Sequence, residues 1–491
     1  MNTREPLVSK ALTAAIVICG LVYILVYMAI VSQRIQYPFE LEWMEGGSLD
    51  HVLRILAGKQ IYVAPSIEFV PFMYTPVYYY VAALFSWVIG PGFLPLRLVS
   101  FLASLGCLWV IFWWVKRETG RAVPGVVAAS LFAATYRIGG AWFDLARVDS
   151  LFLFLLLASV YAIRFWPSTR GTMLAAVLAS LAFLTKQVGL VALFPMALYL
   201  WLTHKSRAYV FLGVSLCLSV LMAVVLDSIT LGWFLYYLFL PMNHSSEWVE
   251  WFAFWFRDLI KPFPVAVGLI VILGLMRKKL DHEAFYFYFF AGFALLGISF
   301  VSRLHVGGWD NVLLPAYAIV SVMTGLAVHY LTARDSGANP ELPYIMPVAV
   351  SVLILCQFLS LSYNPFKQIP TKADLAAGLN LVEQIRHYPG DVYVPYHPYV
   401  ASMAGKRPYA HRMAVWDVLR SHDTQISAIL EQEIRDAIEN RSFDCIIVQQ
   451  DPNIENLMES FYRKECPTFG DKEVFWPVAG KRTRPDDVHV P

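Results

Sequence analysis

Long apolar runs recur along most of this chain, and they constrain its fold more than any other feature. The chain is 58% hydrophobic and 15% charged, whereas soluble proteins carry about 25% charged residues. Because a bilayer crossing needs roughly 20 apolar residues, the runs predict a polytopic all-α membrane protein with about 11 transmembrane helices. The candidate spans are 11–31, 95–115, 122–141, 149–165, 172–187, 188–203, 208–227, 262–276, 284–302, 311–330 and 344–362.

Basic loops predict the orientation of these spans, because Lys and Arg gather in cytoplasmic loops. Basic clusters fall at every second connection if 172–203 is a tight hairpin and if 74–90 does not fully cross. We therefore expect a cell (inner or plasma) membrane protein with a cytoplasmic N-terminus and an extracytoplasmic C-terminus. The clusters are Arg4 with Lys10, 116–121, 164–170, 204–207, 277–279 and 331–343.

The composition changes after residue 362, which predicts two domains. Residues 1–362 form the membrane domain, with an acidic first outer loop at 32–94. Residues 363–491 alternate amphipathic helices (375–387, 431–440) with short strands (391–394, 444–449), as expected for a small α/β domain outside the membrane. Cys445 and Cys466 share this domain and could pair if it faces an oxidising compartment.

Three carboxylates follow the first span in the segment 39–47: Glu40, Glu42 and Glu45. Carboxylates beside lipid are costly and often functional. One of them would serve as a general base that takes the proton of an acceptor hydroxyl. The alternative is a solvated loop whose acids only decorate the membrane interface.

A second charged group, Asp144, Arg147 and Asp149, stands where an outer loop enters the next span. Arg147 has the planar fork that suits a phosphate or a carboxylate. The alternative is a simple ion pair, because Asp144 and Arg147 are three residues apart. Lys186 and Gln187 occupy the tip of the apolar hairpin, where a lysine either reaches the interface or meets an anion.

Further candidates lie in two other expected outer segments. Arg303, His305 and Asn311 surround a Gly-Gly pair, and the first two could contact a phosphate; a polar turn is the alternative. Tyr74 precedes Thr75-Pro76 near the acidic loop and could bind a donor head group; interface packing is the alternative.

Other functional classes find little support. The net charge of +2 and the lack of a basic stretch interleaved with aromatic residues exclude a nucleic-acid partner. The six cysteines have no metal-ligand spacing. No cofactor is expected, and a divalent metal is not indicated.

In order and spacing, the motifs resemble the GT-C superfamily of membrane glycosyltransferases, including the bacterial relatives of protein O-mannosyltransferases and aminoarabinose transferases and the RgtA-B-C-D-like family. The resemblance covers 1–362. It rests on the acidic first loop, Leu56-Ala-Gly-Lys-Gln-Ile-Tyr62, Tyr74-Thr-Pro-Val-Tyr-Tyr-Tyr80, Leu96-Arg97-Leu98, Lys116-Arg-Glu-Thr-Gly120, Ala146-Arg-Val-Asp-Ser150, Leu184-Thr-Lys-Gln187 and Gly307-Gly-Trp-Asp-Asn311.

The resemblance implies transfer of a sugar from a polyprenyl-phosphate donor to a hydroxyl of a glycan, lipid or protein at the outer face. A first-loop acid would be the base. The usual Asp-Glu pair is absent here, and Glu45 fits the position best, with Glu42 next. Asp149 with Arg147 resembles the second acidic site, and Lys186 would face the donor phosphate.

Two other functions remain open at this point. A lipid or polysaccharide transporter or flippase without chemistry would spread polar residues along a path through the membrane and often shows repeats. A membrane scaffold with a C-terminal binding domain would not bring Glu45, Arg147 and Lys186 into one pocket.

Overall fold

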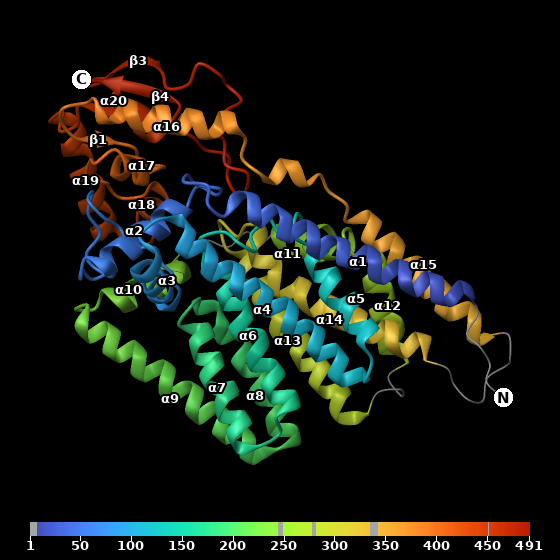
Figure 1. The fold of residues 1–491 in the computed structure, drawn as a ribbon. Helices are drawn as coiled ribbons and strands as arrows, with labels where there is room; N and C mark the ends of the chain where they lie inside the picture. Colours follow the sequence, from blue (N-terminus) through green and yellow to red (C-terminus); the bar gives the residue numbers. More distant parts are fainter. Residues whose placement is uncertain (1–6, 244–248, 277–280, 334–341, 450) are drawn as a thin grey trace.

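A computed structural model describes residues 7–243, 249–276, 281–333, 342–449 and 451–491, and it consists mostly of helices (Figure 1). The helices of the apolar part are α1 (Leu7–Arg34), α2 (Glu45–Leu56), α3 (Val77–Ile89), α4 (Phe93–Thr119), α5 (Ala122–Ala134), α6 (Asp149–Phe165), α7 (Thr169–Phe183), η1 (Gln187–Gly189), α8 (Leu190–Thr203), α9 (Lys205–Ile229), α10 (Trp233–Phe239), η2 (Leu240–Asn243), α11 (Val249–Ala253), the π-helix η3 (Phe254–Ile260), α12 (Pro264–Leu275), α13 (His282–Leu304), η5 (Asp310–Leu313), α14 (Leu314–Thr332) and α15 (Leu342–Ser360).

Five helices in the described residues are long and apolar enough to cross a membrane. They lie at 10–34, 93–119, 205–229, 282–304 and 310–332, and two bent helix pairs raise the number to at most seven. The expected number of about 11 spans is therefore not confirmed. Arg4, residues 277–279 and residues 334–341 of the expected basic loops lie outside the described residues.

Small residues allow the central helices to pack closely. The Ala-rich helix α5 lies against α1, α4 and α14. A Cβ at Gly125 would lie 2.7 Å from the carbonyl oxygen of Phe112, and one at Gly325 would lie 2.8 Å from that of Pro124. Close backbone approach of this kind is how apolar helices gain packing energy where water provides no driving force.

Two segments that were ambiguous in sequence now have a defined shape. The segment 74–90 contains the helix α3, whose 13 residues extend about 20 Å at 1.5 Å per residue, less than the roughly 30 Å hydrocarbon core. The segment 172–203 breaks at Leu184–Lys186 between α7 and η1. Helix α7 packs mainly against α6 and α9, and α8 packs mainly against α13 and α9, so the two helices have little contact with each other.

After residue 360 the chain forms η6 (Pro365–Gln368), α16 (Lys372–Arg386), β1 (Val392–Tyr393), α17 (Pro398–Met403), α18 (Arg412–Leu419), α19 (Thr424–Glu439), β2 (Cys445–Val448), α20 (Pro452–Met458), β3 (Arg463–Pro467) and β4 (Asp487–Val490). The strand order is β1-β2-β4-β3, with β1 parallel to β2 and the other pairs antiparallel. Leu430, Ile434 and Ile438 form the buried stripe of α19. Cys445 and Cys466 lie on β2 and β3, on either side of β4, and are not joined.

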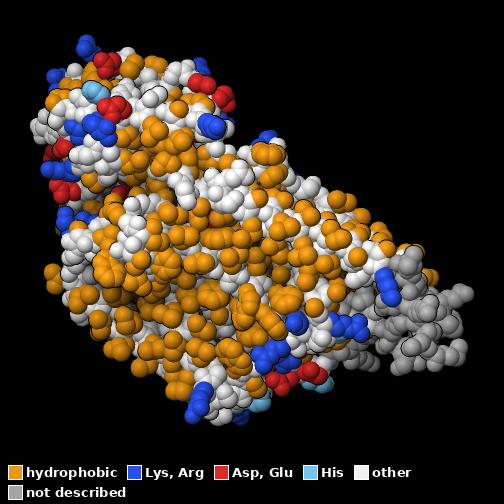
Figure 2. Space-filling view, viewed as in Figure 1, with side chains coloured by type: hydrophobic (Ala, Val, Ile, Leu, Met, Phe, Trp, Pro, Cys, Tyr) orange, Lys and Arg blue, Asp and Glu red, His pale blue; other side chains and the backbone are white. Residues whose placement is uncertain are grey.

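The C-terminal elements rest on α2 and the neighbouring first loop at one end of the helices (Figure 1). The two parts share a hydrophobic core, in which Phe39 packs against Phe475 with ring centroids 5.2 Å apart and Phe93 packs against Tyr399 at the same distance. In Figure 2 most charged side chains gather on this end and on the opposite edge, with apolar side chains between them. That distribution suits a protein whose middle lies in lipid.

Candidate active site

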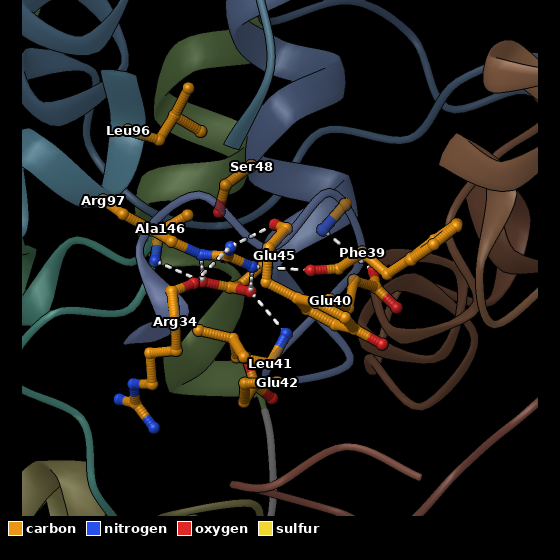
Figure 3. Close-up of polar contacts among 12 residues, drawn as sticks. Arg34, Phe39, Glu40, Leu41, Glu42, Glu45, Ser48, Leu96, Arg97 and Ala146 are labelled. Atoms are coloured by element: carbon orange, nitrogen blue, oxygen red, sulfur yellow. Dashed lines mark hydrogen bonds and ion pairs between the residues drawn. The ribbon is translucent and has the colours of Figure 1, made fainter. Parts of the chain in front are cut away.

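The loop between α1 and α2 folds around a buried ion pair between Glu45 and Arg97 (Figure 3). Arg97 Nη2 donates to Glu45 Oε2 at 2.6 Å, and Arg97 Nε donates to Oε1 at 3.0 Å. The amides of Leu41 and Ala146 donate to the same carboxylate at 2.7 and 2.6 Å. Glu45 thus accepts four hydrogen bonds and is 0% exposed.

This environment keeps Glu45 charged. Burial alone would raise its pKa, but the charge and hydrogen bonds of Arg97, together with the two amides, outweigh burial and lower the pKa. Arg97 also donates to the carbonyl oxygens of Tyr37 and Phe39, at 2.6 and 2.7 Å. The pair therefore determines the path of the loop, and neither oxygen of Glu45 is left for a substrate.

A second buried pair, Arg34 with Asp144, fixes the segment that carries Arg147 and Asp149. Arg34, the last residue of α1, donates to both oxygens of Asp144 at 2.8 and 2.6 Å and to the carbonyl oxygen of Ala141 at 2.8 Å. Both side chains are 0% exposed. Asp144 therefore pairs with Arg34 rather than with Arg147, and its role in the structure is to hold the loop.

Glu42 is the first-loop carboxylate with an oxygen still available. Its Oε2 accepts from Arg147 Nη1 at 2.6 Å and from the amide of Met44 at 3.2 Å. Its Oε1 is buried and has no hydrogen-bond partner among the described residues. Burial, opposed by Arg147, raises the pKa of Glu42 to about 7. Buried polar atoms are nearly always satisfied in native proteins, so Oε1 is an acceptor position that a water or another bound molecule can fill.

Tyr74 connects this pair to a second polar group. Arg147 Nη2 donates to the Tyr74 hydroxyl at 3.0 Å, and the Arg147 guanidinium carbon lies 5.6 Å from the Tyr74 ring centroid. Lys186 Nζ lies 6.0 Å from the same ring. Lys186 and Asn311 both donate to Oδ1 of Asp149, at 2.7 and 2.9 Å.

The second polar group opens into a small pocket with mostly apolar walls. Asp149, Lys186 and Asn311 form its polar end, and the rest of its lining is Phe152, Val188, Ile298, Ser302, Val312, Leu314 and Pro315. Oδ2 of Asp149 and Nε of Arg147 are buried without hydrogen-bond partners in the described part of the chain. The cavity volume is about 10 Å³, roughly the space of one water molecule, so a phosphate would fit only if the pocket widened.

The helix break at 184–186 is what brings Lys186 to this place. The segment 73–77 docks onto the break, since the Val77 amide donates to the Leu184 carbonyl oxygen at 2.9 Å. Gln187 contributes by donating to the Met73 carbonyl oxygen at 2.8 Å. Its other amide atom, Oε1, is buried without a partner among the described residues.

Arg303 and His305 are placed differently from these residues. Arg303 Nε donates to Asp258 Oδ2 at 2.9 Å, and Arg303 Nη1 donates to the Gly308 carbonyl oxygen at 2.7 Å. Glu250 lies 3.3 Å from the same guanidinium. Both acids also pair with Arg257, so Arg303 is already engaged in a network of two arginines and two acids. His305 begins the turn after α13, with the Gly308 amide donating to its carbonyl oxygen at 2.8 Å.

The C-terminal elements add contacts that the sequence did not point to. His397 Nδ1 is hydrogen-bonded to Glu40 Oε2, and His411 Nε2 lies 2.9 Å from the Trp43 carbonyl oxygen. Burial raises the pKa of Glu40 well above its usual range and lowers that of His397 to about 3. Burial thus disfavours the charged form of both side chains. Glu40 thus links the first loop to the C-terminal elements.

The sequence did contain a signal that Arg97 has a buried partner, because an arginine early in an apolar helix is costly unless it is paired. No comparable signal marked His397 or His411. Among the described residues, no group of three or more His, Cys, Asp and Glu side chains could hold a metal ion.

Comparison with known proteins gives this geometry a context. The family model described as Dolichyl-phosphate-mannose-protein mannosyltransferase matches residues 73–233. The structure of ArnT from Cupriavidus metallidurans in the apo state superimposes with a TM-score of 0.62 and 12% identity, covering 98% of both chains. The chain has the GT-C fold. No curated protein matches the sequence.

Two further solved structures share the GT-C fold. ArnT from Cupriavidus metallidurans bound to undecaprenyl phosphate is 12% identical, with a TM-score of 0.59 over 97% of this chain and 98% of that one. The oligosaccharyltransferase AglB from Archaeoglobus fulgidus, in complex with an inhibitory peptide and a dolichol-phosphate, is 10% identical, with a TM-score of 0.50 over 88% of this chain and 69% of that one. The expected resemblance to the superfamily is thus confirmed.

Proposed function

We propose that this protein is a glycosyltransferase that moves a sugar from a polyprenyl-phosphate donor to an acceptor hydroxyl. The observation that carries the proposal is Glu42, whose Oε2 is bound by Arg147 while its Oε1 is buried and unpartnered among the described residues. A carboxylate held in this way can take a proton from a hydroxyl group. The GT-C fold and the match to the mannosyltransferase family support the same reaction class.

The structure favours Glu42 over Glu45 as the base. Glu45 fits the family spacing best, but all of its hydrogen-bonding capacity faces Arg97 and two backbone amides. Its pKa is lowered, so it is a weak base, whereas the pKa of Glu42 is about 7. A general base works best when its pKa is close to the working pH.

In the proposed reaction the acceptor hydroxyl gives its proton to Glu42 Oε1 as its oxygen bonds to the anomeric carbon. The bond from that carbon to the phosphate oxygen breaks, and its electron pair leaves with polyprenyl phosphate. Attack opposite the leaving group inverts the anomeric centre. Because the leaving phosphate is already anionic, a general acid is not required.

Arg147 and Lys186 would stabilise the charge that develops on the phosphate. Both cations flank Tyr74, and Lys186 lies at the polar end of the apolar-walled pocket. Asp149, which accepts from Lys186 and Asn311, would orient them. Tyr74 and Gln187 complete the donor site. Arg303 and His305 would contribute only if the acids around Arg303 rearranged.

The arrangement argues against the two other functions. A scaffold would not need Glu45, Arg147 and Lys186 near one another, yet Glu45 accepts from the amide of Ala146, and Lys186 donates to Asp149 three residues later. A transporter would distribute its charges along a path, whereas these charges gather at one end of the helices. We propose that this end faces the outside of the cell membrane and that the acceptor is a glycan, lipid or protein.

The experiment that tests the function is donor turnover by the purified, reconstituted protein. The donors are undecaprenyl-phosphate-linked mannose, glucose, galactose, arabinose and aminoarabinose, with an envelope extract of cells lacking the protein as acceptor. Release of undecaprenyl phosphate, and its loss in Glu42→Gln, supports the proposal. Equal release by Glu42→Gln and wild type would exclude Glu42 as the base.

A further inference from the structure

The backbone of the C-terminal domain reaches back to the candidate base. The Ala479 amide donates to the Leu41 carbonyl oxygen at 3.0 Å, and residues 42 and 479 form an isolated parallel β-bridge. The segment 478–481 thus runs beside the first-loop residue proposed as base, although more than 400 residues of chain separate them. We refer to 478–481 as the C-terminal strap.

Gly480 lies directly against the Glu42 side chain. A Cβ placed on Gly480 would lie 2.6 Å from Glu42 Cγ and 2.8 Å from Oε1. Real Cβ atoms do not approach that closely, so any side chain here would displace the carboxylate. Gly480 also has a φ of +72°, a conformation that other residues adopt at a cost. Both the space and the backbone conformation therefore require glycine.

The next residue, Lys481, fixes the strap to both domains. Its Nζ lies 4.4 Å from the ring centroid of Trp416 and 5.5 Å from those of Trp43 and Tyr396. Trp43 follows Glu42 in the first loop, whereas Tyr396 and Trp416 belong to the C-terminal domain. An ammonium this close to aromatic rings is attracted to their π-electrons. Lys481 is therefore suited to hold the strap in place beside Glu42.

We propose that the C-terminal strap positions the catalytic base: Gly480 provides the bare backbone against which the Glu42 carboxylate packs, and Lys481 keeps that backbone in place. This inference rests on the proposed role of Glu42. Gly480 and Lys481 are positioning residues, because they act on the reaction through Glu42. The burial that raises the pKa of Glu42 is consistent with the strap lying against its side chain.

The kinetic test compares Gly480→Ala with two glycine controls in the reconstituted protein. Gly405 has a φ of +78° and no atom within 4 Å of an added Cβ, so Gly405→Ala measures the effect of backbone strain without a steric clash. Gly470 also has no atom within 4 Å of an added Cβ, so Gly470→Ala measures the effect of a glycine-to-alanine change without a clash. Gly480→Ala should lower kcat at least tenfold and leave the donor KM within about twofold. The two controls should keep wild-type kcat. Wild-type kcat in Gly480→Ala would overturn the proposal.

Two further measurements separate the strap from the assigned base. In a Glu42→Gln background, Gly480→Ala should cause no additional loss of kcat, because its effect passes through Glu42; an equal fold-loss in both backgrounds would overturn the positioning role. Wild-type turnover in Glu42→Gln would instead exclude the base.

Hydrogen exchange tests the strap without any turnover. Lys481→Ala should speed amide exchange in residues 39–46 and leave α19 unchanged. Unchanged exchange in 39–46 would overturn the inference even if the protein proves inactive on every donor.

Discussion

Arg147 holds one oxygen of Glu42 at 2.6 Å, while the other oxygen of the same carboxylate lies buried without a hydrogen-bond partner among the described residues. One oxygen of the Glu42 carboxylate, Oε2, is therefore bound, and the other, Oε1, has no hydrogen-bond partner among the described residues. Both oxygens of Glu45, three residues later, accept hydrogen bonds from Arg97 and from backbone amides. The two neighbouring acids therefore differ in how many of their oxygens are bound.

The first prediction concerns the pH dependence of the reaction. Glu42 acts as a base only when deprotonated, so kcat/KM should rise with pH through about 7. That is the pKa of Glu42 when burial raises it and the charge of Arg147 partly opposes the rise. Replacing Arg147 by Gln removes the charge that lowers this pKa, so the acid limb should move to higher pH. Arg147→Lys keeps a charge and should move it less. An acid limb near pH 4 in the wild type would contradict this assignment.

The second prediction separates Glu45 from Glu42 by stability. Glu45→Gln leaves Arg97 buried without a counter-charge, which typically costs about 3–5 kcal/mol. Glu42 has a pKa of about 7 and is therefore partly protonated near neutral pH, and Arg147 keeps the charge of Asp149 nearby, so Glu42→Gln should lose less stability. Thermal unfolding in detergent measures both. A Glu45→Gln protein as stable as wild type would show that the Arg97 pair does not shape the loop.

The third prediction concerns the pair between Arg34 and Asp144, both 0% exposed. Arg34→Met alone should destabilise the protein by about 3–5 kcal/mol, because Asp144 is left buried and unpaired. The double variant Arg34→Met/Asp144→Leu should recover much of this loss. Unfolding midpoints of the single and double variants provide the test, and additive losses would refute the pairing.

The fourth prediction addresses lipid-phosphate binding. Lys186→Ala should weaken binding of undecaprenyl phosphate by roughly 10- to 100-fold, in line with about 1.5–3 kcal/mol for a hydrogen bond to a charged group. Lys116, which lies 4.1 Å from the Trp113 ring at the other end of α4, offers a control, since Lys116→Ala should bind normally. Equal loss in both variants would point to a general charge effect.

The apolar runs predicted the positions of long and short helices alike: the run at 149–165, for example, coincides with α6 (Asp149–Phe165). The apolar runs at 11–31 and 208–227 correspond to α1 and α9 because a long run specifies a helix by itself. Helices such as α5, with 13 residues, depend on the neighbours that cover them, and α5 is almost entirely buried. The number of about 11 spans expected from the sequence is therefore not confirmed, since length and composition support five to seven in the described residues.

The candidate site shows a similar limit. The structure brings together Glu42, Arg147, Tyr74, Asp149, Lys186 and Asn311, all of which the motifs had marked. What the sequence could not provide was the partner of each charge. Glu45 and Arg97 are 52 residues apart, and Glu40 and His397 are 357 apart. Such pairing depends on the packed fold, and it decides which carboxylate is left available.

The most direct test of the central claim is release of undecaprenyl phosphate by wild type and Glu42→Gln in the same reconstituted assay, with undecaprenyl phosphate binding measured alongside. We predict that Glu42→Gln binds the lipid phosphate normally and releases it from the donor 10²- to 10⁴-fold more slowly, about the contribution of a general base. Undiminished release by Glu42→Gln would contradict the account.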